Sequence, residues 1–319
     1  MKKVFVTRQL PDSVMAKLYD QFEVDMWPYE KKPVTREVLL EKAREVDGLI
    51  TMLTEKIDDE VFEQAKNLKI IANLAVGYDN IDLEAAKKHN VTITNTPDVL
   101  TDTTADLTFA LLLATARRIP ESMTYIKNDQ WKTWSPLLLA GSDVHHKTIG
   151  IVGMGNIGEV VAKRATGFDM EILYYNRSRK VEAEEALNAT YVSFDKLIKQ
   201  SDFVVCMTPL TNETKGMFNE EIFKQMKSSA IFINSSRGGV VDEEALYKAL
   251  DSGTIKAAGL DVFDNEPIRH DHPLLELDNV VALPHIGSAS VETRLNMMEL
   301  AIENVEKVLR GKEPVTPVK

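Results

Sequence analysis

Three charged side chains in the second half of the chain could carry out acid–base chemistry on a small anion. Arg237 follows the apolar segment 231–233, Glu266 lies within 259–267, and His285 follows the apolar segment 280–283. A guanidinium binds carboxylates, an imidazolium can protonate a carbonyl oxygen, and a carboxylate can keep that imidazole charged. Each residue alone also has an ordinary structural explanation. Their order at successive predicted strand ends favours one site, because open α/β sheets bind ligands at the carboxyl ends of their strands.

A glycine-rich segment lies upstream of these residues. Gly153, Gly155 and Gly158 follow the apolar segment 149–152 and precede a helical pattern at 159–165. In this context the first glycine permits a tight turn, the second lets a pyrophosphate approach the backbone, and the third allows close packing of helix on strand. A glycine-rich turn without a ligand is the alternative. The flanking strand and helix favour a dinucleotide site.

The end of the next predicted strand, 171–175, bears on which dinucleotide is bound. NAD-binding folds usually carry a carboxylate there, about 20 residues past the first glycine, for the ribose hydroxyls. This chain has Arg177, Ser178 and Arg179 instead, within the segment 176–180. Arginine can bind a 2′-phosphate with two parallel hydrogen bonds, whereas a carboxylate would repel it. We therefore expect NADP(H) to be preferred over NAD(H), the alternative being a solvated basic loop.

Strand-like and helix-like segments alternate along almost the whole chain, which predicts parallel sheets covered by helices. A chain of 319 residues suits two domains. The first joint is expected at 101–118, where Thr103 and Asp106 suggest a capping box before an apolar helix. The second is expected near 288–292, before the amphipathic segment 295–309. The predicted domains are 1–100 plus 289–319, which is discontinuous, and 101–288, which binds the dinucleotide.

Composition limits the partners and the compartment. The net charge of −11 argues against nucleic acid or an anionic membrane as a partner. The single cysteine, Cys206, lies in an apolar run and is expected in a buried strand, which fits a reducing, cytoplasmic setting. The longest apolar run, 109–114, is too short to span a bilayer, and no secretory signal follows Met1. The pair His270 and His272 lacks further ligands nearby, so no metal site is expected.

The sequence resembles the D-isomer-specific 2-hydroxyacid dehydrogenases over nearly its whole length. The similar segments are 76–82, the glycine loop 153–158, 234–242, 260–267 and 284–287. Within that family it is most similar to the glyoxylate/hydroxypyruvate reductases, through segments 96–106, 131–134 and 285–289. The basic segment 176–180 departs from the NAD-type pattern of the wider family and resembles the NADPH-using reductases.

The resemblance implies roles for the residues singled out above. Arg237 would orient and polarise the keto acid, His285 would donate the proton in reduction, and Glu266 would stabilise the imidazolium. Asp261 would contact the nicotinamide amide. The remaining implied cofactor contacts are Asn156, Ile157, Thr104, Pro209, Ser235, Ser236, Gly287 and Ser288, and the implied substrate contacts are the N–H groups of Val76 and Gly77 together with Leu53, Trp134 and Ser288.

The resemblance also implies a fold, an activity and a partner. The fold is two doubly wound parallel-sheet domains, the larger a Rossmann domain and the smaller flavodoxin-like. The activity is NAD(P)H-dependent reduction of glyoxylate or hydroxypyruvate to the D-2-hydroxy acid. The partner is a second copy of the chain, with Trp134 on an arm that approaches the neighbour's site. The alternatives are a dehydrogenase for lactate, phosphoglycerate or phosphite, and a non-catalytic cofactor sensor.

Overall fold

The structure is a computed structural model that describes residues 1–318. The chain divides into two compact units. The first consists of residues 1–100 together with the chain from 289 onward, and the second consists of residues 101–288. Each unit is a parallel sheet with helices on it, so the predicted α/β class with two doubly wound sheets is confirmed.

The first unit contains a five-stranded parallel sheet in the order β2-β1-β3-β4-β5, the strand order of flavodoxin-like folds. Its three inner strands, β1, β3 and β4, are mostly apolar and buried because both faces of the sheet are covered there, whereas the edge strand β2 alternates exposed and half-buried residues. Its elements are β1 (Lys3–Val6), α1 (Asp12–Tyr19), β2 (Glu23–Met26), α2 (Arg36–Ala43), β3 (Gly48–Thr51), α3 (Asp59–Gln64), β4 (Ile70–Asn73), α4 (Leu83–Lys88), β5 (Thr92–Thr94) and α12 (Val291–Leu309).

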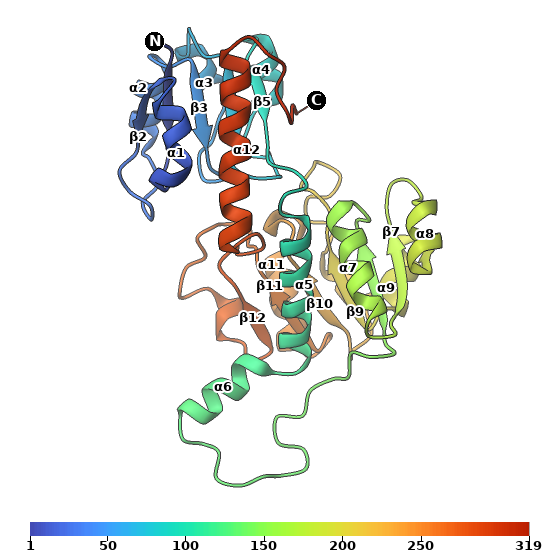
Figure 1. The fold of residues 1–319 in the computed structure, drawn as a ribbon. Coiled ribbons are helices and arrows are strands. Elements are labelled where there is room, and N and C mark those ends of the chain that lie inside the picture. The colour runs from blue at the N-terminus through green and yellow to red at the C-terminus, as the bar shows by residue number, and fades with distance from the viewer. Residues whose placement is uncertain (319) are drawn as a thin grey trace. The chain divides into compact units, whose positions relative to one another are not determined.

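The last helix, α12, completes this unit from the far end of the sequence. It begins after Ser290, whose hydroxyl accepts the N–H of Thr293, and one face buries Met297, Ala301 and Val305. That face packs on β3 and β4, and Figure 1 shows α12 lying along the sheet beside α1. The first unit is therefore discontinuous in sequence.

The second unit contains a seven-stranded parallel sheet in the order β12-β11-β10-β9-β6-β7-β8. The order reverses between β6 and β9, as in the Rossmann fold, where the crevice at the reversal binds the dinucleotide. Its elements are α5 (Thr101–Ala116), α6 (Ile119–Lys127), β6 (Thr148–Val152), α7 (Asn156–Thr166), β7 (Glu171–Tyr175), α8 (Val181–Leu187), β8 (Ala189–Tyr191), α9 (Phe194–Gln200), β9 (Phe203–Cys206), α10 (Glu220–Gln225), β10 (Ile231–Asn234), η1 (Gly238–Val240), α11 (Glu243–Asp251), β11 (Ala257–Leu260), η2 (Pro273–Glu276) and β12 (Val280–Ala282).

Helix α5 corrects one expectation. It begins at Thr101, so Thr103 lies inside the first turn and cannot be the N-cap of a capping box. Asp106 instead accepts a hydrogen bond from Arg164 of α7 at 2.7 Å, and Arg164 also binds Asp102 at 3.0 Å. Asp102 and Asp106 thus join α5 to α7, because the guanidinium of Arg164 on the facing helix is a stronger hydrogen-bond partner than an N–H group of the local turn.

Helix α6 and the chain that follows it project from the second unit as an arm (Figure 1). We call residues 119–138 the arm. Its apolar side chains are exposed, including Ile126, Trp131, Trp134 and Leu137. Across residues 1–318, every helix is too short or too polar to cross a membrane.

Cys206 ends β9 in the core of the second unit. Its thiol is buried, and burial raises its pKa. The expectation of a buried strand cysteine is confirmed, and the neutral thiol is a poor nucleophile.

Candidate active site

The three predicted catalytic side chains lie at the carboxyl ends of adjacent strands of the second unit. Arg237 follows β10, Glu266 follows β11, and His285 follows β12. Strand β11 pairs with both β10 and β12, so the three chain segments leave the sheet side by side. The three residues are far apart in the sequence, but the segments that carry them therefore leave the same edge of the sheet next to one another.

His285 and Glu266 form a direct pair. Nδ1 of His285 lies 2.7 Å from Oε2 of Glu266, and both side chains are about one-third exposed or less. The other carboxylate oxygen, Oε1, accepts the N–H of Phe263 at 2.9 Å. A carboxylate held at both oxygens orients the imidazole with Nδ1 inward, which leaves Nε2 as the nitrogen available for proton transfer.

Glu266 remains ionised despite partial burial. Burial acts to raise its pKa, but the hydrogen bond and charge of His285, the N–H of Phe263 and the charge of Arg237 together hold the pKa below the ordinary value. The charge of Arg237 makes the smallest of these contributions.

Asp261 fixes the backbone on which His285 sits. Its carbonyl accepts the N–H of His285 at 2.9 Å, and its Oδ1 accepts the N–H of Ile286 at 2.8 Å. These bonds hold His285 in the left-handed region, at φ 53°, which costs a non-glycine residue about 1 kcal/mol or more. The two hydrogen bonds, one to the carbonyl of Asp261 and one to its side chain, offset that cost.

The second carboxylate oxygen of Asp261 is suited to a ligand. It is buried, and it has no hydrogen-bond partner among residues 1–318. Burial raises the pKa of Asp261, although the N–H groups of Ile286 and Gly287 and the charge of His285 act to lower it. An unsatisfied buried acceptor is costly, so a donor such as a nicotinamide carboxamide fits this position.

Arg237 is placed by a loop that Asn234 closes. The side-chain amide of Asn234 donates to the carbonyl of Arg237 at 2.9 Å, and its oxygen accepts the N–H of Ser236 at 3.1 Å. The next residue must be glycine, because a Cβ on Gly238 would lie 1.8 Å from the backbone of Phe263. This close approach brings the Arg237 loop against the segment that carries Glu266.

The glycine loop has the geometry that the sequence predicts for a phosphate site. Gly153 has φ 105°, and a Cβ on Gly158 would lie 2.2 Å from the Gly153 carbonyl oxygen. A Cβ on Gly155 would meet no atom within 4 Å. Gly155 is the N-cap of α7 and has no side chain to bind the first N–H groups of the helix. These groups and the helix dipole therefore suit an anion.

The basic segment after β7 contains an internal clasp. The hydroxyl of Tyr174 donates to Glu184 at 2.6 Å and accepts the N–H of Lys180 at 2.7 Å. Arg179 binds the same carboxylate through Nε and Nη2, at 2.8 and 2.6 Å. Arg179 is thus engaged by Glu184, whereas Arg177 and Ser178 are exposed.

The other predicted cofactor contacts of this unit differ in their surroundings. Thr104 is buried next to Gly287, where an added Cβ would lie 3.3 Å from the Thr104 side chain. Ser235 is buried, and its hydroxyl has no partner among residues 1–318, so it can bond a ligand. The rest lie in half-buried or exposed positions of strand-end loops or at the start of α7: Asn156, Ile157, Pro209, Ser236 and Ser288.

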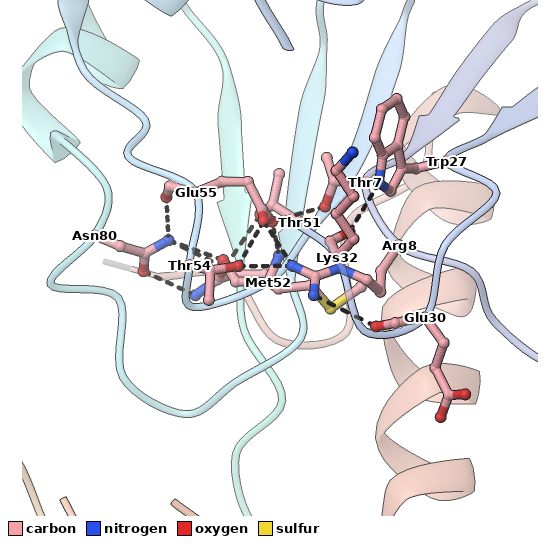
Figure 2. A network of polar contacts seen from close by, with 11 residues as sticks. Thr7, Arg8, Trp27, Glu30, Lys32, Thr51, Met52, Thr54, Glu55 and Asn80 are labelled. Atoms are coloured by element: carbon pink, nitrogen blue, oxygen red, sulfur yellow. Dashed lines mark hydrogen bonds and ion pairs between the residues drawn. The ribbon is translucent and has the colours of Figure 1, made fainter. Parts of the chain in front are cut away.

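The predicted substrate residues of the first unit lie in two strand-end loops. Leu53 follows β3, and Val76 and Gly77 follow β4. Figure 2 shows a polar network of the same unit, which includes Glu55. Glu55 is 4% exposed, and its carboxylate accepts hydrogen bonds from Thr7 at 2.7 Å and from the N–H of Met52 at 2.6 Å. Trp134, the last predicted substrate residue, is 75% exposed on the arm.

Several functional candidates were not predicted from the sequence. Asn73 and Asn234 each end an apolar strand, and each donates its amide to a carbonyl three or four residues further on. An amide at the end of an apolar strand is the signal that could have drawn attention to them. No comparable signal marks Glu55, because two of its side-chain donors, Thr7 and Arg8, are distant in the sequence.

Comparison with known proteins agrees with this geometry. Residues 109–287 match the family model of the D-isomer specific 2-hydroxyacid dehydrogenase NAD binding domain. A glyoxylate reductase of Pyrococcus horikoshii is 53% identical, over 99% of this chain and 95% of its own. A crystal structure of a Thermus thermophilus protein superposes with a TM-score of 0.93 at 45% identity, covering 99% of this chain and all of that one.

A second similar solved structure contains a bound dinucleotide. It is an NADPH-dependent glyoxylate/hydroxypyruvate reductase of Sinorhizobium meliloti, in complex with NADP and malonate. It is 32% identical, with a TM-score of 0.85, and the match covers 99% of this chain and 96% of that one. The family match, the strand order and the His285–Glu266 pair lead to one conclusion: this chain belongs to the D-isomer specific 2-hydroxyacid dehydrogenase family.

Proposed function

We propose that this protein reduces glyoxylate, or hydroxypyruvate, to the corresponding 2-hydroxy acid with NADPH. The observation that carries the proposal is the 2.7 Å pair of His285 and Glu266, with the loop of Arg237 packed against the segment that carries Glu266, on a sheet with a dinucleotide-type glycine loop. The names of relatives about half identical over the full chain support glyoxylate as the substrate.

The residues of the second unit account for the chemistry. Bound NADPH supplies a hydride to the carbonyl carbon. Nε2 of His285 would donate a proton to the carbonyl oxygen, so that the C=O double bond becomes a C–O single bond with one new C–H and one new O–H bond. Glu266 stabilises the imidazolium before the transfer, and Arg237 holds the carboxylate and polarises the carbonyl. The hydride brings two electrons and one hydrogen nucleus, the imidazolium brings one further proton, and His285 regains its proton from solvent.

The two units would divide the work. Residues 101–288 would bind the dinucleotide, with the glycine loop on the pyrophosphate and Asp261 on the nicotinamide amide. Residues 1–100 and 289–319 would bind the substrate carboxylate through the N–H groups of Val76 and Gly77. Leu53 and Trp134 would limit the size of the substrate.

The preference for NADPH would come from the basic segment. Arg177 and Ser178 are exposed at the end of β7, where the ribose of a dinucleotide lies in this fold. Arg179 already shares the carboxylate of Glu184, so we assign the main phosphate contact to Arg177. NADH remains a weaker alternative, because no carboxylate is present to bind the ribose hydroxyls.

We also propose a homodimer in the cytoplasm. The arm exposes several large apolar side chains, among them Trp134 at 75% and Leu137 at 81%. Exposed apolar patches of this kind mark protein interfaces. The single buried cysteine fits a reducing compartment. Light scattering coupled to gel filtration would give twice the mass of 35.8 kDa.

One assay tests the function. Purified protein is followed by NADPH absorbance with glyoxylate, hydroxypyruvate, pyruvate and phosphohydroxypyruvate, and the series is repeated with NADH. We expect kcat/KM to be highest with NADPH and either glyoxylate or hydroxypyruvate. Faster turnover of pyruvate or phosphohydroxypyruvate would select a different dehydrogenase. NADPH binding without turnover of any acid would select a cofactor sensor.

A further inference from the structure

The loop after β4 holds three successive carbonyl groups in fixed directions. The carbonyl of Ala75 accepts the N–H of Thr96 at 2.8 Å. The carbonyl of Val76 accepts the side-chain amide of Asn95 at 2.8 Å, and that of Gly77 accepts the side-chain amide of Asn73 at 3.0 Å. Two of the three donors are therefore asparagine side chains that approach from different strand ends.

Clamped carbonyls also fix the N–H groups that follow them. A trans peptide is planar, and its N–H points opposite to its C=O. The N–H groups of Val76, Gly77 and Tyr78 consequently point away from Thr96, Asn95 and Asn73. Within residues 1–318 these three N–H groups donate to no protein atom. Successive unpaired N–H groups in a turn can form a concave site for an anion.

The two asparagines differ in how they are themselves supported. Asn73 is fully buried, and its side-chain oxygen accepts the hydroxyl of Thr51 at 3.1 Å. Its amide also donates to Asn80 at 3.2 Å, and Asn80 in turn donates to the carbonyls of Met52 and Glu55. Figure 2 shows Asn80 beside Glu55 in this network. Asn95 is half-buried and belongs to the segment after β5.

We infer that Asn95 and Asn73 are positioning residues that aim the N–H groups of Val76, Gly77 and Tyr78 at the substrate carboxylate. The inference rests on the proposed function for the identity of the anion. Neither asparagine needs to touch the substrate. Each acts by holding one peptide plane, so that the direction of its N–H group is set before the anion arrives and less ordering is needed on binding.

Substitution of Asn95 by Asp tests this inference with little change in shape. A carboxylate cannot donate to the carbonyl of Val76 and repels it, so the 76–77 peptide should rotate. For Asn95→Asp we expect KM for glyoxylate to rise about tenfold or more, and the inhibition constant of oxamate, a carboxylate that cannot be reduced, to rise in parallel. We expect kcat to stay within about threefold and the Kd of NADPH to be unchanged, because the glycine loop lies in the other unit. Asn95→Ala, which removes the donor without repulsion, should raise both constants about threefold.

Asn90→Asp is the matched control. Asn90 lies in the same unit, it is exposed, and its side chain forms no hydrogen bond within residues 1–318. This variant should keep the wild-type KM for glyoxylate, inhibition constant of oxamate, kcat and Kd of NADPH. A folded Asn95→Ala or Asn95→Asp with unchanged glyoxylate KM and oxamate inhibition would overturn the inference, as would an equal loss in Asn90→Asp. If Asn95→Asp does not fold, Asn95→Ala decides. A wild-type protein that binds oxamate but does not reduce glyoxylate would overturn the proposed function alone, since oxamate affinity still reports on the asparagines.

Discussion

Nδ1 of His285 lies 2.7 Å from Oε2 of Glu266, and the other oxygen of that carboxylate accepts the N–H of Phe263. The first bond sets the orientation of the imidazole, and the second prevents the carboxylate from turning away. Because β11 and β12 are paired neighbours, the bond joins two adjacent strand ends of one rigid sheet. A proton donor mounted in this way needs little reorganisation when a substrate binds.

Removal of the imidazole should abolish most of the proton transfer. For His285→Ala we expect kcat to fall about 10²- to 10⁴-fold, the range that a positioned general acid contributes. The Kd of NADPH, measured by fluorescence titration, should stay close to wild type. His270→Ala is the control, because His270 is exposed on the loop before η2 and should keep full activity. Activity of His285→Ala near wild type would place the acid elsewhere.

Glu266→Gln should change the pH dependence of the reaction. The pKa of Glu266 is held below its ordinary value, so the carboxylate stays ionised well below neutral pH and can stabilise a positive charge on the neighbouring imidazole. Glutamine keeps the shape but removes the charge. The alkaline limb of kcat/KM for reduction should therefore move to lower pH, and the maximum should fall. An unchanged limb would show that the carboxylate does not support the proton donor.

Much of the fold and of this site could be predicted from the sequence, because the signals are local. Apolar runs of four or five residues between turn residues mark β6, β9 and β10, and the glycine spacing marks the start of α7. Arg237, Glu266 and His285 were predicted from residue type and from their position after strands. In a parallel sheet, residues that follow neighbouring strands lie at the same edge, so their positions in the sequence are enough to predict that they lie close together.

The supporting residues could not be predicted, because their contacts are non-local. The hydroxyl of Thr7, 48 positions away in the sequence, is one donor to the buried carboxylate of Glu55. Asn95 reaches the carbonyl of Val76 across 19 positions. The capping box at Thr103 was wrong for a related reason, since Asp106 is bound by Arg164 from a different helix. Local propensity gives no information about such partners.

Two glycines of the phosphate loop, Gly155 and Gly158, should respond differently to alanine. Gly155 has an ordinary backbone conformation (φ −87°, ψ −170°) and open space at its Cβ, so Gly155→Ala should keep the thermal midpoint and weaken NADPH binding, because the methyl group occupies the anion's approach. Gly158→Ala would place its Cβ 2.2 Å from a backbone oxygen, so it should also lower stability by about 1–3 kcal/mol. Thermal unfolding and NADPH titration measure both effects. Equal midpoints for the two variants would contradict this account.

Arg177 should control the preference between the two cofactors. For Arg177→Ala we expect KM for NADPH to rise about 10- to 100-fold, as expected when a charged hydrogen bond is lost, while KM for NADH changes little. Arg179→Ala should have a smaller effect, because its guanidinium is already shared with Glu184. The ratio of kcat/KM for NADPH and NADH is the measurement. A larger effect at Arg179 than at Arg177 would reverse the assignment.

Glu184 should make a contribution to stability that depends on pH. The hydrogen bonds from Arg179 and Tyr174 lower its pKa from 4.5 to about 2, so the folded state binds this proton less readily than the unfolded state. The sign follows from linkage: the contribution is complete above pH 4.5 and is lost as the pH falls toward 2. The difference in free energy of unfolding between wild type and Glu184→Gln should therefore be constant from pH 7 to 5 and shrink below 4.5. Urea unfolding at several pH values between 7 and 3 measures it, with Glu185→Gln, an exposed position on the same helix, as the control. A difference that stays constant down to pH 3 would mean that the clasp of Tyr174, Glu184 and Arg179 does not hold the carboxylate ionised.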